Sequence, residues 1–284
     1  MQRSAAAKTP GMGGWGVWRW GELRAALGAT EVRRRVAAGL LTRVAYGWYA
    51  APSADPVVVT AVRLGGHLGC LSACRLHGLW VPPESRVHVS FNRRVPMALP
   101  AGVAAHADRE IGHEPAVRPL QACLEEVVRH HSTETALIVL DSALNRRLIT
   151  ESEVLHLVAR CPAPKAAVVR YLDRRAESGS ETRVRYFFQR RRVPVEPQVQ
   201  VPGVGRVDLR IGRCLMVECD SREHHTAPEN YQRDRLRDLV LVADGRRVVR
   251  LTYEQVFFQW PVTQQFLSRL VQLRLHRSLP FSAR

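Results

Sequence analysis

The chain has 284 residues, enough for two domains, and its 46% hydrophobic and 24% charged residues exclude wholesale disorder. Its net charge is +16, and all but two of its 42 basic residues are arginines. The longest uncharged stretches, such as 64–74, fall short of the roughly 20 apolar residues that cross a bilayer, and the first residues lack the apolar core of a signal peptide. We therefore expect a soluble, cytoplasmic protein with no membrane partner.

The positive charge is concentrated at the two ends of the sequence. Residues 1–55 hold 8 basic and 3 acidic side chains, residues 56–164 hold 11 and 10, and residues 165–284 hold 23 and 13. A polyanion is the natural partner of such ends, because each phosphate that is neutralised releases counterions. Charge alone does not distinguish DNA from RNA or from a membrane surface.

Residues 1–55 have the pattern of a winged helix. Two short helices are predicted over 20–27 and 31–40, and an alternating segment after them turns at Gly47 as a small hairpin would. Helix, helix and wing is the order of a winged-helix DNA reader, although a small helical cap with a hairpin fits the pattern equally well. The candidate DNA contacts on the second helix are Arg33, Arg34 and Arg35.

Residues 56–164 form a mostly helical middle region. Helical patterns cover 57–79, 120–130, 134–147 and 151–161, and a strand is expected over 86–91. A boundary is predicted at the proline-rich segment that ends this region, Cys161-Pro-Ala-Pro164.

The cysteines and histidines of the middle region carry no recognisable ligand spacing. Cys70 and Cys74 lie near His77, but a zinc site there would need further ligands that the local sequence does not offer. We expect buried thiols in a reducing compartment. The histidines expected to be packed or at the surface are His67, His77, His88, His106 and His113.

Residues 165–284 predict an α/β (α+β) domain with a mixed sheet flanked by helices. A helix begins at Ser178, and strands follow that end near Asp208 and Asp220. A helix over 228–243, a strand over 247–251 and a helix over 263–276 complete the domain.

Four acids of this domain fall at the ends of predicted elements: Glu181, Asp208, Glu218 and Asp220. Asp208 and Glu218 share a sheet face only if the turn between their strands has an odd number of residues or a bulge corrects the register, whereas Glu218 and Asp220 share a face without that condition. Crowded carboxylates repel one another and lose hydration, which a divalent cation offsets. Singly, Glu181 could belong to a capping box with Ser178, and Asp208 or Asp220 could pair with an arginine.

Six blocks, in this order, resemble the very-short-patch-repair-like (Vsr-like) endonucleases: SETRVRYFF, PQVQV, GRVDLRI, LMVECDSREHH, YQRDRLRDLVL and RRVVRLTYEQV. That family belongs to the restriction-endonuclease-like PD-(D/E)XK superfamily, and the similarity covers about residues 178–256. The segment GLLTRVAYGWYA is similar to the winged helix of AbiEi-type antitoxins, and this similarity extends loosely through SACRLHGLW and RVHVSF. The expected domains are a winged helix (1–55), an AbiEi-like middle region (56–164) and a Vsr-like nuclease (165–284).

The resemblance implies a DNA endonuclease, dependent on Mg²⁺ or Mn²⁺, that nicks double-stranded DNA. Asp208, Glu218 and the main-chain carbonyl of Cys219 would bind the metal, and Glu181 would support it. His225 (or, as a substitute, His224) would activate water, and Asp234 would orient the histidine or hold structure. The arginines expected to contact nucleic acid are Arg222, Arg233 and Arg237.

Two departures from the family pattern concern the catalytic geometry. Asp220 stands at the superfamily's lysine position, and Ser221 stands where glycine is usual. The alternative function is a DNA-binding regulator or antitoxin-like protein whose nuclease-like domain does not cut; an RNA-directed nuclease would use the same site as the endonuclease.

Overall fold

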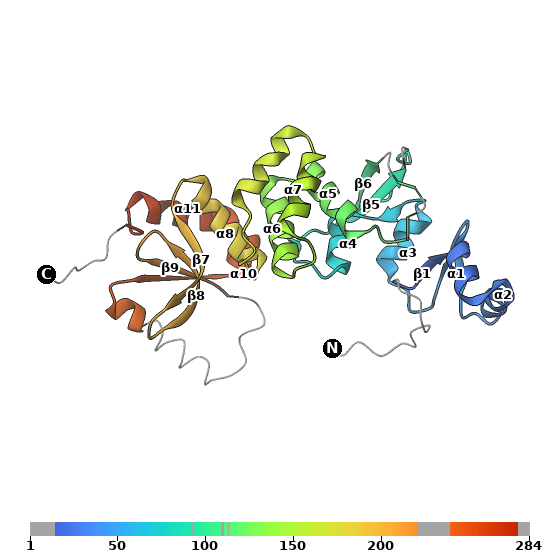
Figure 1. The fold of residues 1–284 in the computed structure, drawn as a ribbon, viewed down its shortest axis with the longest axis horizontal. Helices are drawn as coiled ribbons and strands as arrows, with labels where there is room; N and C mark the ends of the chain where they lie inside the picture. Colours follow the sequence, from blue (N-terminus) through green and yellow to red (C-terminus); the bar gives the residue numbers. More distant parts are fainter. Residues whose placement is uncertain (1–14, 93, 109–110, 113, 221–238, 278–284) are drawn as a thin grey trace. The chain divides into compact units, whose positions relative to one another are not determined.

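The computed structural model describes residues 15–92, 94–108, 111–112, 114–220 and 239–277 (Figure 1). Two compact units make up the chain, one of residues 1–79 and 84–130 and the other of residues 80–83 and 131–284. The mixed α/β class expected from the sequence is confirmed; the division into three domains stays a prediction. Within the described ranges, no helix is both long and apolar enough to span a membrane.

The first unit opens with two helices and a small sheet. The elements are β1 (Val17–Arg19), α1 (Trp20–Leu27), α2 (Ala29–Ala37), β2 (Thr42–Ala45) and β3 (Trp48–Ala50), and the sheet order is β1-β3-β2. Leu23 and Val32 hold the two helices in a common core with Trp18. The turn between β2 and β3 places Gly47 at φ +76°, where glycine is favoured. The helices and the hairpin lie where the sequence predicts them.

The rest of this unit contains more β-structure than the sequence predicts. Its elements are α3 (Pro56–Arg63), β4 (His67–Leu68), α4 (Cys70–Leu76), β5 (Val87–Asn92), β6 (Val103–Asp108) and α5 (Leu120–His130). The strands form a sheet of order β4-β5-β6 in which β5 and β6 are parallel. The single helix expected over 57–79 is wrong: Gly65 takes φ +82°, and a Cβ on Gly66 would lie 2.5 Å from Val89, so the chain turns there into β4.

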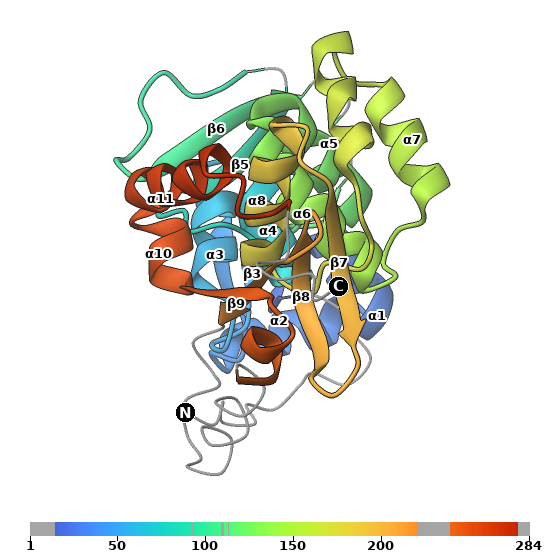
Figure 2. The ribbon, with the colours of Figure 1, turned by 90° about the vertical axis from the view of Figure 1, so that its left-hand side faces the viewer.

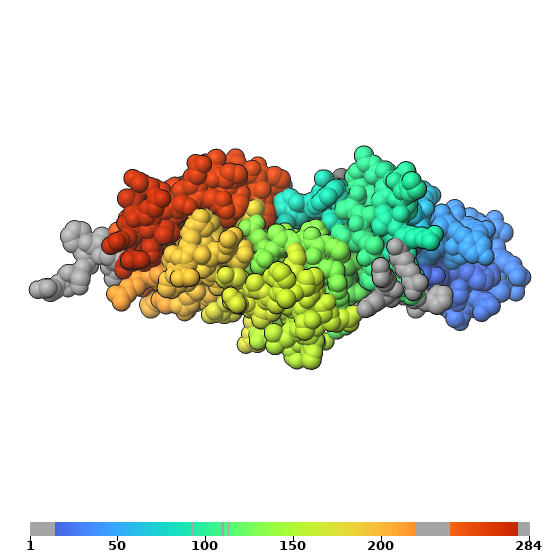
Figure 3. Space-filling model, turned by 90° about the horizontal axis from the view of Figure 1, so that it is seen from above, coloured from blue at the N-terminus to red at the C-terminus, as the bar shows by residue number. Residues whose placement is uncertain are grey.

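The second unit begins with a helical layer: α6 (Thr133–Asn145), α7 (Glu151–Ala159), the 3₁₀ helix η1 (Ala163–Tyr171) and α8 (Gly179–Arg190). The hydroxyls of Ser132, Thr150 and Ser178 cap α6, α7 and α8, each accepting a main-chain N–H. Both α6 and α7 pack against η1, and their green to yellow surface is continuous in Figure 3.

The sheet of the second unit has four strands: β7 (Val195–Val201), β8 (Gly205–Ile211), β9 (Leu215–Asp220) and β10 (Arg247–Thr252). Their order is β10-β9-β8-β7, with β9 and β10 parallel and the other pairs antiparallel. Figure 2 shows β7 and β8, in gold, as a long hairpin. Two further helices follow, α10 (Tyr253–Phe257) and α11 (Trp260–Gln272).

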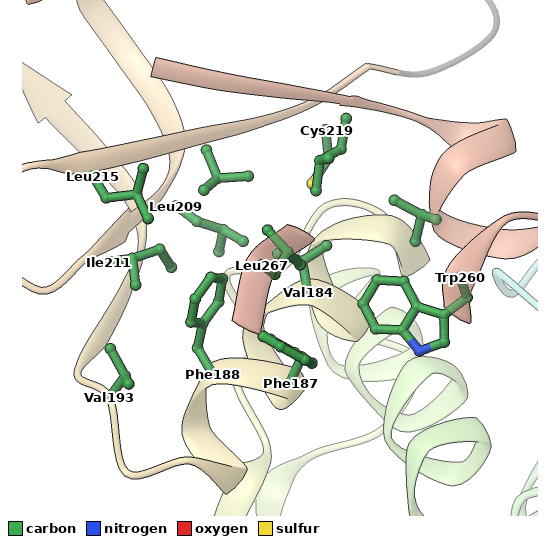
Figure 4. Close-up of a cluster of buried hydrophobic side chains, with 13 residues drawn as sticks. Val184, Phe187, Phe188, Val193, Leu209, Ile211, Leu215, Cys219, Trp260 and Leu267 are labelled. Atoms are coloured by element: carbon green, nitrogen blue, oxygen red, sulfur yellow. The ribbon is translucent and has the colours of Figure 1, made fainter. Parts of the chain in front are cut away.

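Helices cover both faces of this sheet. On one face, Phe187 and Phe188 of α8 and Leu267 of α11 pack against Leu209 and other buried side chains of β8 and β9 (Figure 4). On the other face, Leu241, within the helical residues 239–243, packs against β7, β8 and β9. The expected C-terminal mixed sheet flanked by helices is therefore confirmed.

Candidate functional site

Asp208 of β8 and Glu218 of β9 lie directly next to Leu209 and Val217, the last pair in the register of the two strands. The turn between these strands has three residues, 212–214, and the strands pair Ile211 with Leu215 and Leu209 with Val217. Continuing that register by one pair brings Asp208 opposite Glu218. Directly opposed residues of antiparallel strands project from the same face of the sheet. The three-residue turn therefore meets the condition, stated above, that Asp208 and Glu218 share a face only if the turn has an odd number of residues.

The Asp208 carboxylate is fixed against the neighbouring strand. Its Oδ2 accepts a hydrogen bond of 2.8 Å from the main-chain N–H of Cys219. Asp208 is half-buried and Glu218 is buried. Asp208 therefore binds the backbone of the residue whose carbonyl the family resemblance assigns to the metal.

Glu181 reaches this region from the first turn of α8. Ser178 caps the helix by accepting the Glu181 N–H at 3.1 Å. The buried Glu181 carboxylate accepts the N–H of Glu177 at 3.1 Å and the Nε2–H of Gln198 at 2.7 Å. The Ser178 side chain thus caps α8 as a capping box requires. The Glu181 carboxylate, however, binds Glu177 and Gln198 of β7.

The charge on Glu181 is strongly disfavoured. Burial, with a further contribution from the charge of Asp208, raises the pKa of Glu181 to about 7 from its usual 4.5. Hydrogen bonds from Glu177 and Gln198 oppose this rise without cancelling it. Glu181 and Asp208 thus form an electrostatically coupled pair in which one carboxylate is poised to take up a proton near neutral pH.

Gln198 is a residue of this site that the sequence analysis did not single out. It adopts φ +55°, and the pairing of β7 with β8 passes from Pro197–Leu209 to Val199–Val207 without including it. Its buried Oε1 has no hydrogen-bond partner within the described ranges. A buried acceptor of this kind, on a side chain that binds the Glu181 carboxylate, is a group that a water molecule or a hard cation satisfies.

The donor set at this end of the sheet consists of oxygens, which suits Mg²⁺ or Mn²⁺. The residue types and the strand register fit such a cation. Among the described residues, the carboxylates of Glu181, Asp208 and Glu218 do not form a group with oxygens all within 4.8 Å of one another. Binding a cation would therefore have to draw them together.

Several predicted site residues lie outside the described ranges: Ser221, Arg222, His224, His225, Arg233, Asp234 and Arg237. Asp220 is the last residue of β9, where its backbone pairs with Thr252 of β10. Of the predicted set, the structure thus places Glu181 within the electrostatic influence of Asp208 and adds Gln198 as a hydrogen-bond partner of Glu181. The roles of the histidines stay predictions.

The three predicted arginines of α2 are not equivalent. Glu31 accepts hydrogen bonds from Arg34 at 2.7 Å and from Arg35 at 2.8 Å. Arg33 is exposed. At the tip of the β2–β3 hairpin, Tyr46 is 91% exposed and the guanidinium of Arg43 lies 5.3 Å from its ring centroid. A cation and a ring at the wing tip suit contact with a nucleic-acid backbone and bases.

A second concentration of arginines lies on the C-terminal unit. A cavity of about 400 Å³ is lined by Arg191, Arg192, Arg213, Arg277 and His276, among other residues. It includes part of the turn that joins β8 to β9. Asp208 lies in the middle of β8, because the strand continues to Ile211 and does not end near Asp208 as the sequence predicted. The lining of the cavity has the charge expected of a phosphate-binding surface.

The described residues contain one further group of ligand-type side chains, which the sequence analysis missed. Cys70, His88, His106 and His131 bring one ligand atom each within 4.8 Å of all the others, and the first three are buried. Two of the other histidines are engaged with main-chain carbonyls: His67 with Pro115 at 2.7 Å and His77 with Arg118 at 2.8 Å. His77 is thus not the partner of Cys70 that its position in the sequence suggests.

Comparison with known proteins gives no identification. The sequence matches no protein-family model and no curated protein.

Proposed function

We propose that this protein is a metal-dependent DNA endonuclease that nicks one strand of a duplex. The observation that carries the proposal is the position of Asp208 and Glu218 directly next to the last paired residues of β8 and β9, Leu209 and Val217, with the buried Glu181 close enough for the charge of Asp208 to raise its pKa. Acids placed in this way destabilise one another unless a cation or a proton lies among them. The resemblance of residues 178–256 to Vsr-like endonucleases supports the same reading.

Each residue of the site would have a separate role in the proposed reaction. Asp208, Glu218 and the Cys219 carbonyl would hold Mg²⁺ or Mn²⁺. When bound, the ion lowers the pKa of its water and offsets charge on the phosphate. Glu181, whose pKa is about 7, can accept a proton near neutral pH. Gln198 donates to Glu181 through Nε2 and keeps its Oε1 available to a water molecule.

Two basic surfaces support DNA as the substrate. One is the α2 and wing surface of the first unit, with Arg33, Arg43 and Tyr46. The other is the arginine-lined cavity of the C-terminal unit. Guanidinium groups bind phosphate oxygens in a bidentate manner and release counterions, so both surfaces favour a polyanionic ligand.

The decisive experiment is plasmid nicking. Supercoiled DNA is incubated with Mg²⁺ or Mn²⁺ and the full chain, either wild type or carrying Asp208→Asn or Glu218→Gln. The matched control is Glu196→Gln, because Glu196 is an exposed acid of the same sheet that pairs with Arg210 on the neighbouring strand. We expect nicking by wild type and control and a loss of at least about 100-fold in the two site variants. Equal nicking by all four proteins, or none with any divalent metal, contradicts the proposal.

The second candidate function is a DNA-binding regulator or antitoxin-like protein. The exposed Tyr46 and Arg43 of the wing favour it, since they could recognise DNA without any catalysis. It predicts sequence-selective binding that needs no metal and survives Asp208→Asn, combined with no nicking. An RNA-directed nuclease would share the carboxylate site, and competition between DNA and RNA substrates distinguishes it.

A further inference from the structure

We propose that Cys70, His88, His106 and His131 bind a zinc ion in a closed site whose role is structural. This site is separate from the carboxylates of the C-terminal sheet and does not depend on the proposed endonuclease function. The four ligand atoms already lie within 4.8 Å of one another, which is the juxtaposition on which the inference rests.

Three of the ligands lie on three different elements, and the fourth directly follows a helix. Cys70 is the first residue of α4, His88 lies on β5, His106 lies on β6, and His131 is the residue joined directly to the last residue of α5. In the parallel pair of β5 and β6, His88 pairs with Ala104 and Ser90 with His106. His88 and His106 therefore lie on the same face of the sheet, offset by two residues along the strands.

The two strand histidines are close to the geometry that zinc requires. His88 Nδ1 and His106 Nε2 are 2.9 Å apart, and their rings stack with centroids 5.2 Å apart. Zinc binds imidazole nitrogens at roughly 2.0–2.1 Å in a tetrahedral arrangement, so two such nitrogens stand about 3.3 Å apart. If the distance between the two nitrogens increased by a few tenths of an ångström, a zinc ion could take the place of the proton between them.

The backbone around Cys70 is held in an unusual conformation. Cys70 has φ +47°, a region that residues other than glycine rarely occupy and that persists where surrounding contacts impose it. Its N–H donates to the buried Glu126 at 2.8 Å. Glu126 also accepts from Ser90 of β5 and from Arg118, each at 2.5 Å. These bonds orient the start of α4, and with it the thiol, toward the two histidines.

The outer nitrogen of His88 faces a carboxylate, as is common for metal-binding histidines. His88 Nε2 lies 3.6 Å from Glu84 Oε2, while Nδ1 faces His106. An acid on the far side of a ligand imidazole fixes the ring orientation and makes the ligating nitrogen more basic. The main-chain N–H of His88 donates to Ser72 of α4 at 2.9 Å, which ties β5 to the helix that carries Cys70.

The types of ligand atom in this group indicate which metal it binds and that the site is structural. Three imidazoles and one thiolate suit Zn²⁺ and are poor ligands for Mg²⁺. Four protein ligands complete a tetrahedron, and because three of them are buried, no open position is left for substrate. Zinc held in this way would join segments that are 18, 18 and 25 residues apart along the chain.

Metal analysis of the full chain tests the site. The chain is produced with zinc, desalted and assayed for metal by mass spectrometry; apo protein is then titrated with Co²⁺, whose absorption reports thiolate ligation. The variants are Cys70→Ser and His106→Asn. The matched control is Cys74→Ser, because Cys74 is a buried cysteine of the same helix that is outside the group.

We expect about one zinc per chain and a thiolate-to-cobalt band in wild type and in Cys74→Ser, with zinc affinity at least about 100-fold weaker in Cys70→Ser and His106→Asn. His106→Cys keeps a zinc ligand and should retain the metal, which separates loss of a ligand from misfolding. No zinc and no thiolate band in wild type overturn the proposal, as does equal zinc in Cys70→Ser and Cys74→Ser; the group would then be a hydrogen-bonded pair of histidines beside a thiol. Plasmid nicking with Mg²⁺ is a separate readout.

Discussion

Arg185 of α8 and Asp141 of α6 form a salt bridge of 2.5 Å in which neither side chain is more than 1% exposed. Asp141 also accepts the Thr182 hydroxyl and the N–H of Asp173, each at 2.9 Å. Burial nevertheless raises the pKa of Asp141 to about 6. This pair ties α8 to α6, and α8 is the element that carries Glu181, whose carboxylate binds Gln198 of β7.

Arg185→Met should destabilise the protein by about 3–5 kcal/mol, because it leaves the Asp141 carboxylate buried without its counterion. Adding Asp141→Leu should recover part of that loss, since the double variant has no isolated charge. Unfolding in urea measures both. The control is Arg175→Gln, which removes an exposed partner of Asp173 and should cost less than about 1 kcal/mol. Losses of equal size for Arg185→Met and Arg175→Gln would contradict this account.

Glu181→Gln should stabilise the metal-free protein at pH 8 and have little effect at pH 4. Because the pKa of Glu181 is about 7 in the folded state against 4.5 ordinarily, its protonation favours folding below pH 4.5, and this contribution is lost as the pH rises through 7. The difference is on the order of 3 kcal/mol at most, at about 1.4 kcal/mol per pKa unit. Thermal unfolding between pH 4 and 8.5 is the measurement. A Glu181→Gln profile parallel to wild type would count against the shift.

Gly179→Ala should destabilise α8 by about 1–3 kcal/mol, the range seen when a packed site receives an extra methyl group. A Cβ on Gly179 would lie 2.2 Å from the Trp80 ring. Gly21 of α1 has no neighbour within 4 Å of the equivalent position and no positive φ, so Gly21→Ala should be neutral or stabilising. Combining Gly179→Ala with Trp80→Leu should relieve the clash. Denaturant unfolding compares the four proteins, and a neutral Gly179→Ala would refute the close contact.

Arg33→Gln should weaken DNA binding and flatten the dependence of log K on log salt by about one unit, as expected when one phosphate contact is lost. Arg35→Gln should have a smaller effect, because Arg35 is partly buried and already paired with Glu31. Fluorescence anisotropy with a short duplex at several salt concentrations measures the slopes. Equal slopes for wild type and Arg33→Gln would place the phosphate contacts on other arginines.

Most helices and the C-terminal strands could be predicted from the sequence because helix caps and turns are determined by neighbouring residues. The Ser178 cap and the hairpin turn at Gly47 both depend on residues within a few positions of one another. The strand β6 escaped prediction because its sequence, VAAHAD, is rich in alanine, and only pairing with β5 makes it a strand.

The features of the sites that escaped prediction depend on distant contacts. Gln198 matters because a positive φ turns its amide toward Glu181, which no sequence spacing indicates. Cys70 begins α4, where the sequence predicted the middle of one continuous helix, and His106 lies on β6, a strand that the sequence did not predict. Strand register, rather than residue spacing, defines both sites.

The hydrogen bond from the Cys219 N–H to Asp208 has a consequence for evolution. It gives the acid at position 208 a stabilising role that is independent of any reaction, whereas the buried Glu181 opposes folding whenever it is ionised. In relatives that do not carry out the proposed cleavage, replacing the residue at 181 would therefore stabilise the fold, whereas replacing the residue at 208 would destabilise it. An alignment of relatives should show that the acid at position 181 on the helix is replaced more often than the acid at position 208 on the strand.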